Sequence, residues 1–198
     1  MSNAFRYEPQ SSYVTSSFYD WLTEVSVDWN RAIVRKDPID EMRFRAVSHL
    51  LFTEARLLDQ QAFDTWLGLY VDECAYWIPS DRPASDPRAA ITLEFHDRRR
   101  LLDRIVRLQT GFAYSQLPAS RTSRQIGGLE VWQSPLRQGD WHARYNFSLA
   151  ESRNGETRLL SGWNGFVLRE TAGGVALVVK QINLIDCDLP QGNNSFFL

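Results

Sequence analysis

The chain has 198 residues, with 22 lysine or arginine side chains against 24 aspartate or glutamate side chains, so its formal net charge is −2. This balance excludes a general binder of nucleic acid or acidic lipid, because affinity for phosphate depends on an excess of basic side chains. Uninterrupted apolar runs, such as residues 175–179, are at most five residues long and far shorter than the ~20 residues that span a bilayer. Only two cysteines occur, which excludes a disulfide framework and favours a cytoplasmic protein with reduced thiols.

The first part of the chain has the periodicity of helices. Apolar residues recur on one helix face over residues 18–29. After Pro38, Asp40 can cap a second helix that ends near Asp59. A short helix is expected over residues 63–70.

The pattern then changes to strands. Residues 75–79 are rich in aromatic and β-branched side chains and end in proline, as a strand does. A helix is expected again over residues 96–108. From Ser120 onward strands dominate, with tight turns predicted at Asn154-Gly155 and at residues 172–174.

The last three strands are predicted at residues 141–151, 157–169 and 175–186, in an antiparallel meander. Helices followed by strands indicate an α+β fold in which helices cover one face of a curved sheet. Without an internal repeat or a low-complexity linker, residues 1–198 are expected to form a single domain. Residues 1–15 are expected to be an irregular N-terminal extension.

The sequence offers no pattern of metal ligands. His49, His96 and His142 are scattered over three predicted elements, and neither Cys74 nor Cys187 has a cysteine or histidine within four residues. The interpretation favoured by this scatter is three histidines that are exposed or hydrogen-bonded. No metal, cofactor-binding or catalytic residue is therefore assigned to this chain.

Nucleophiles and phosphate loops are also missing. Cys74 lies in an apolar strand, and the thiolate of Cys187 is disfavoured by the aspartates on both sides of it. The pairs Gly127-Gly128 and Gly173-Gly174 do not open helices, so they indicate hairpins or bulges.

One helix concentrates basic side chains. The residues are Arg98, Arg99, Arg100, Arg104 and Arg107. Because Asp97 and Asp103 are interleaved with them, a solvated or ion-paired helix face is favoured over an anion site.

General acid–base catalysis remains possible in an apolar pocket between the sheet and the helices. The candidates are Asp72, Glu73, Tyr76 and His142. The alternative for the first two is the exposed start of a strand. This hypothesis describes a free-standing pocket enzyme, a dehydratase or an isomerase.

A series of motifs resembles one family over the region from about Leu50 onward. The motifs are Glu54-Ala55-Arg56-Leu57-Leu58-Asp59, then Phe63, Trp66, Leu67, Leu69-Tyr70, Tyr76-Trp77-Ile78-Pro79, Asp86-Pro87-Arg88, Asp97-Arg98, Arg104-Ile105-Val106-Arg107-Leu108, Thr110-Gly111, Gln116, Pro118 and Ser120-Arg121-Thr122. The last motifs are Ile182-Asn183-Leu184-Ile185-Asp186 and Asn194-Ser195-Phe196-Phe197-Leu198. Together they resemble the small (β) subunit of aromatic-ring-hydroxylating dioxygenases, the Rieske non-haem iron oxygenases, and are nearest to benzoate- or anthranilate-type systems. The sequence departs from that pattern at His96, where the family often has an acidic residue, and at Gln125-Ile126-Gly127-Gly128.

The resemblance implies a cystatin-like, nuclear-transport-factor-like cone in which helices pack on a strongly curved, mixed and mostly antiparallel sheet. It also implies a non-catalytic structural role in an α3β3 hexamer, with self-association of the small subunits as a trimer. The large (alpha) subunit would hold the Rieske [2Fe-2S] cluster and mononuclear Fe(II), and a ferredoxin or reductase would act on the complex. The implied reaction is cis-dihydroxylation of an arene with O2 and NAD(P)H-derived electrons, in bacterial catabolism of aromatic compounds.

The chain is also rich in aromatic residues, at 13%, and its last residues are Phe196, Phe197 and Leu198. Such a segment exposes an apolar patch unless it docks on its own domain or on a neighbour. We expect it to support assembly more than it supports the folding of the sheet.

Overall fold

A six-stranded sheet organises the molecule, which is described from a computed structural model over residues 14–33, 39–111 and 114–198. Its strand order is β2-β1-β6-β5-β4-β3. The strands are β1 (Tyr70–Pro79), β2 (Thr92–His96), β3 (Arg121–Gln133), β4 (Asp140–Arg153), β5 (Glu156–Thr171) and β6 (Gly174–Leu184). Strands β1 and β6 are parallel, whereas every other neighbouring pair is antiparallel. The sheet is therefore mixed and mostly antiparallel, and the fold is α+β as expected.

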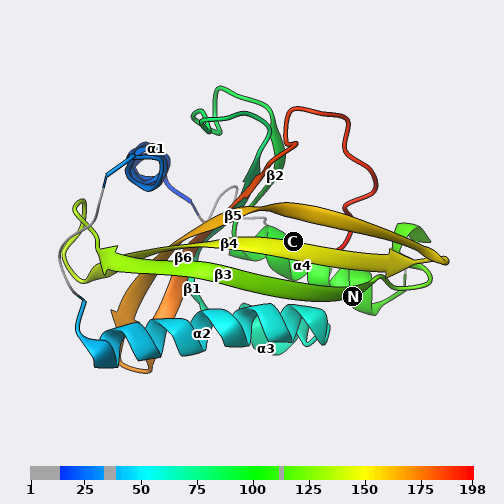
Figure 1. Cartoon of the computed structure of the whole chain (residues 1–198), viewed down its shortest axis with the longest axis horizontal. Coiled ribbons are helices and arrows are strands. Elements are labelled where there is room, and N and C mark those ends of the chain that lie inside the picture. Colours follow the sequence, from blue (N-terminus) through cyan, green and yellow to red (C-terminus); the bar gives the residue numbers. More distant parts are fainter. Residues whose placement is uncertain (1–13, 34–38, 112–113) are drawn as a thin grey trace, which may run out of the picture.

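Helices cover both faces of this sheet (Figure 1). They are α1 (Ser16–Trp29), α2 (Glu41–Asp59), α3 (Phe63–Leu67) and α4 (Arg98–Gln109), with a short 3-10 helix at Tyr114–Gln116. Helices α2 and α3 lie on one side of the sheet, and α1 lies on the other (Figure 1). The position of α1 differs from the expectation that helices cover only one face of the sheet.

The predicted start of the second helix agrees with its cap in the structure. The Asp40 side chain accepts a hydrogen bond from the Arg43 amide at 2.9 Å and so begins α2. Thr15 accepts one from the Phe18 amide at 3.2 Å and begins α1. Of the N-terminal extension predicted at residues 1–15, residues 1–13 lie outside the described part of the chain.

Two predicted boundaries were wrong. The helix expected over residues 96–108 begins at Arg98, because Asp97 caps it by accepting a hydrogen bond from the Arg100 amide at 2.8 Å. His96 instead ends β2, which the sequence analysis missed and which pairs with β1. Tyr70, assigned to the short helix, is the first residue of β1.

The turns predicted between the last three strands are confirmed. Asn154 and Gly155 both have positive φ, 53° and 82°, as a type I′ hairpin turn requires. Gly174 has a φ of 109° at the next turn. Gly127 marks a bulge, since the β3–β4 register shifts between Gly127 and Glu130.

The buried residues form two clusters, one on each face of the sheet. The larger cluster lies between the sheet and α2, α3 and α4. The smaller lies under α1, where Trp29 packs so closely on β5 that a Cβ atom at Gly165 would be 2.6 Å from its indole ring. Only glycine fits at this position.

Within the described residues, no helix combines the length and the apolar character that crossing a bilayer requires.

Candidate functional site

The structure does not bring the four acid–base candidates together. Asp72 is 99% exposed and lies 3.4 Å from Arg98. Glu73 is half-buried near Thr15. Tyr76 belongs to the cluster beneath α2, α3 and α4, whereas His142 lies on the opposite face of the sheet, beneath α1. No shared pocket can use all of them.

His142 has a structural partner. Its Nδ1 atom lies 2.7 Å from Asp28 Oδ2, and Trp132 Nε1 donates a hydrogen bond of 2.9 Å to the same oxygen. All three residues are buried. The cluster ties α1 to β3 and β4, and the sequence signal for it was an aspartate on the buried face of an amphipathic helix.

Tyr76 holds the end of the described chain. Its phenol donates a hydrogen bond of 3.0 Å to the main-chain oxygen of Leu198 and accepts one of 2.8 Å from the Leu198 amide. Burial raises the pKa of Tyr76 far above its ordinary value, so the phenol stays protonated and able to donate.

A buried ion pair lies beside this contact. Lys180 Nζ is 2.8 Å from Glu54 Oε1 and 2.8 Å from the Leu198 oxygen, and Trp66 Nε1 donates to the same carboxylate oxygen at 2.8 Å. Burial lowers the pKa of Lys180 from its ordinary value. Sequence reasoning missed Lys180, although a lysine in the middle of an apolar strand was a visible signal.

Phe196, Phe197 and Leu198 are all buried, and they fill the interior between the sheet and the helices. The Phe197 ring centroid lies 4.7 Å from Trp66 and 5.3 Å from Phe63. The segment docks on its own domain and is part of its core, which argues against the expectation that it serves assembly more than folding.

Cationic side chains bind the main chain of the same segment. Arg104 donates to the carbonyl of Phe196 at 2.7 Å, and Arg124 donates to that of Phe197. The Arg104 guanidinium also lies 4.2 Å from the centre of the Phe197 ring. The protein's own chain thus occupies much of the interior that could hold a small molecule in a free-standing enzyme, and a pocket of about 200 Å³ remains beside Phe63, Phe196 and Phe197.

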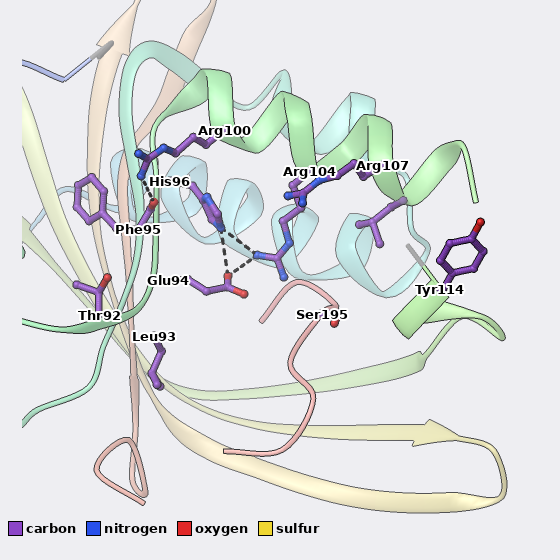
Figure 2. A pocket seen from close by; sticks show the side chains of 11 residues that line it. Thr92, Leu93, Glu94, Phe95, His96, Arg100, Arg104, Arg107, Tyr114 and Ser195 are labelled. Carbon is purple, nitrogen blue, oxygen red and sulfur yellow. Dashed lines mark hydrogen bonds and ion pairs between the residues drawn. The ribbon is translucent and has the colours of Figure 1, made fainter. Parts of the chain in front are cut away.

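An open groove of about 700 Å³ lies beside the filled interior, between β2, α4 and residue Ser195 (Figure 2). Its lining residues are Thr92, Leu93, Glu94, Phe95, His96, Arg100, Arg104, Arg107, Leu108, Tyr114 and Ser195. Glu94, His96 and Arg104 point toward one another in its wall (Figure 2). We call this surface the basic groove.

The wall contains an ion pair between a buried arginine and a half-buried glutamate, with a histidine beside it. Arg104 forms the ion pair with Glu94, and His96 Nε2 lies 3.5 Å from the guanidinium and 3.7 Å from the carboxylate. Burial and the charges of the surrounding arginines lower the pKa of His96 to about 4. Burial raises the pKa of Glu94. At neutral pH the imidazole is therefore uncharged.

The predicted solvated face of α4 is right in part. Arg98 lies near Asp72 and donates to the carbonyl of Tyr70 at 2.9 Å, and Arg99 lies 4.0 Å from Asp103. Arg104 is ion-paired with Glu94, as that prediction allows, but it is buried and not solvated.

The side chains do not suit an iron site. Over residues 14–33, 39–111 and 114–198, no group of three or more His, Cys, Asp or Glu residues is placed to hold a metal ion. Cys74 and Cys187 are buried free thiols. Burial raises the pKa of Cys74 to about 12, and it raises that of Cys187 more than the neighbouring aspartates do.

Comparisons with known proteins match this architecture. The family model for ring hydroxylating beta subunits covers residues 53–191. The 2-halobenzoate 1,2-dioxygenase small subunit of Burkholderia cepacia is 30% identical over 152 residues, which cover 73% of this chain and 89% of the relative.

Solved structures share the fold. The beta subunit of the benzoate 1,2-dioxygenase of Burkholderia mallei superposes with a TM-score of 0.63 at 23% identity, covering 82% of this chain and all of that one. An NTF2-like protein with a cystatin-like fold from Novosphingobium aromaticivorans gives a TM-score of 0.50 at 15% identity, covering 72% of this chain and 81% of that one. These matches confirm the cystatin-like fold.

Proposed function

This chain belongs to the ring hydroxylating beta subunit family, and from this premise we propose that it is the non-catalytic structural subunit of an α3β3 dioxygenase. Relatives in this family are subunits of aromatic dioxygenases, which are oxidoreductases that work as complexes. A large oxygenase subunit is therefore its partner. The proposal includes a stoichiometry of three large and three small subunits, with the small subunits associated as a trimer. It also includes a ferredoxin or reductase that acts on the complex, and the bacterial cytoplasm as the location.

The filled interior carries this proposal. A small molecule can bind between sheet and helices only where that space is empty. Here Phe197 and Leu198 occupy it, and Tyr76 and Lys180 hold the main chain of Leu198. This arrangement supports a chain without catalytic or cofactor-binding residues of its own and opposes a free-standing dehydratase or isomerase.

The iron chemistry belongs to the large subunit in this proposal. The histidines and cysteines of the described chain do not gather into a ligand set for a Rieske cluster or mononuclear Fe(II). When those groups are present in the partner, they supply the activation of O2. The small subunit holds the assembly together in this proposal. A single domain is supported by the one continuous sheet that extends from β2 to β3.

We further propose an arene carboxylate as the substrate of the assembly. This class is suggested by the 2-halobenzoate of the Burkholderia cepacia relative and the benzoate of the Burkholderia mallei structure. The product would be the cis-dihydrodiol of the ring, formed with both atoms of O2, two electrons that originate from NAD(P)H and two protons.

Co-expression with a large oxygenase subunit, sought among the genes next to this chain's own, tests the proposal. We expect a complex of equal numbers of both chains that consumes O2 with benzoate or a substituted benzoate when NADH and a ferredoxin or reductase supply electrons, whereas the small chain alone is iron-free and inactive. Mass photometry gives the stoichiometry, and metal analysis of the untagged chain gives the iron content. Turnover by the small chain alone, or stoichiometric iron in it, would overturn the proposal.

A further inference from the structure

The basic groove contains positive charge that the described protein does not neutralise. Arg104 is paired with Glu94, and His96 is uncharged at neutral pH. Arg100 and Arg107 remain, and neither has a carboxylate within ion-pair distance among the residues that the structure describes. One polar contact of Arg100 is a 3.2 Å hydrogen bond that it donates to the carbonyl of Phe95.

The other arginines of α4 show how unusual this is. Arg98 lies 3.4 Å from Asp72, and Arg99 lies 4.0 Å from Asp103 on its own helix. Arg100 and Arg107 instead share the helix face that borders the groove, together with Arg104 (Figure 2). The three guanidinium charges all lower the pKa of His96, so their fields converge on the groove.

The shape of the groove suits a protein better than a small molecule. Arg100 and Arg107 are exposed side chains at its border, and Tyr114 is 76% exposed. A small carboxylate binds well where the site encloses 70–90% of its surface. An open groove with aromatic and guanidinium groups at its rim instead has the composition of a protein interface, where tyrosine and arginine are enriched.

We propose that the basic groove docks a segment of the large subunit that carries carboxylate side chains, which pair with Arg100 and Arg107. This inference rests on the proposed function, because it identifies the partner as the large subunit. Guanidinium groups can bind carboxylates through two parallel hydrogen bonds, which fixes orientation as well as charge. Leu93 and Leu108 supply the apolar floor for the same segment.

The test is the affinity of the two subunits in a double charge reversal, Arg100→Glu with Arg107→Glu. The probe is the large oxygenase subunit that co-purifies with this chain, purified with its iron, and binding is measured by interferometry at low and high salt. We expect roughly 10- to 100-fold weaker binding at low salt, because each desolvated charge pair at an interface is worth several-fold or more in affinity. The salt dependence of the variant should be shallower than that of the wild type.

Two further variants separate charge from folding. The double variant Arg100→Lys with Arg107→Lys keeps the charge but loses the bidentate geometry of the guanidinium groups. Its affinity for the large subunit should therefore lie between those of the wild type and the charge-reversed variant. Arg31→Glu with Arg121→Glu is the matched control, since both residues are exposed and lie outside the groove. Circular dichroism and the melting temperature verify that every variant is folded.

Each other outcome overturns the inference. Unchanged affinity of the folded double variant for the large subunit means that the large subunit does not contact the basic groove. Loss of self-association by the small chain alone means that a second copy occupies it. Binding of benzoate to the isolated wild-type chain that requires Arg100 and Arg107 means a small-anion site. A wild-type chain that does not bind the large subunit refutes the proposed function instead, so the two failures are distinguishable.

Discussion

The phenol of Tyr76 and the main chain of Leu198 form a reciprocal pair of hydrogen bonds, although 122 residues separate them in sequence. Tyr76 lies in the middle of β1, and Leu198 reaches it from the far end of the described chain. The pair helps to hold Leu198 in the interior between sheet and helices.

Tyr76→Phe removes both hydrogen bonds and leaves a buried amide without its acceptor. We expect a loss of about 1–3 kcal/mol in the free energy of unfolding, because an unsatisfied buried polar group is not rehydrated. Chemical denaturation measures it. Tyr114→Phe is the control, since Tyr114 is 76% exposed. Equal stability of the two variants would mean that Leu198 is held by other contacts.

Phe197→Ala empties the space between Trp66, Phe63 and Arg104. The expected loss is about 3–5 kcal/mol, the range for truncating a buried phenylalanine. Phe52→Ala, at a residue that is 52% exposed, should change the free energy of unfolding far less. A small effect of Phe197→Ala on folding, with a large effect on assembly, would restore the view that this segment serves a neighbouring subunit.

Gly155→Val tests the β4–β5 hairpin. A β-branched residue resists the φ of 82° at this position, so we expect destabilisation of about 1–3 kcal/mol. Gly127→Val is the matched control, because Gly127 lies in β3 with no atom within 4 Å of an added Cβ and without a positive φ. Thermal unfolding compares them, and an unchanged melting temperature for Gly155→Val would contradict the turn geometry.

His96 makes the domain sensitive to acid. Its pKa is about 4 in the folded protein against 6.5 ordinarily, so between these values the unfolded chain binds more protons than the folded chain. The contribution of His96 to the free energy of unfolding is therefore fully present above pH 6.5, and it is lost as the pH falls toward 4. The expected loss is about 2–3 kcal/mol.

The groups that face His96 act in both directions. The arginines Arg100, Arg104 and Arg107 oppose its protonation, and Asp97 favours it. Glu94 has a raised pKa, so its own contribution strengthens folding as the pH falls.

The difference in free energy of unfolding between wild type and His96→Gln isolates the contribution of the histidine. Urea unfolding from pH 4 to 7 measures it, with His49→Gln at an exposed histidine as the control. Parallel profiles for wild type and His96→Gln would refute the prediction.

The sequence by itself determined the elements whose signals are local. The helix at Ser16–Trp29 follows from apolar spacing, and the start of the helix at Glu41–Asp59 follows from the Asp40 cap. The turn at Asn154-Gly155 follows from the freedom of those residues to adopt positive φ. The family resemblance, confirmed by the match over residues 53–191, also came from residue order alone.

Only the tertiary structure decided what depends on distant partners. Strand β2 exists because Thr92–His96 can pair with β1, and five residues carry too little pattern to separate a strand from a helix start. Arg104 looks like a surface residue until Glu94 and the carbonyl of Phe196 are placed beside it. Whether Phe197 and Leu198 cover a neighbour or their own core depends on Tyr76 and Lys180, because burial is a property of the folded chain and not of the segment that is buried.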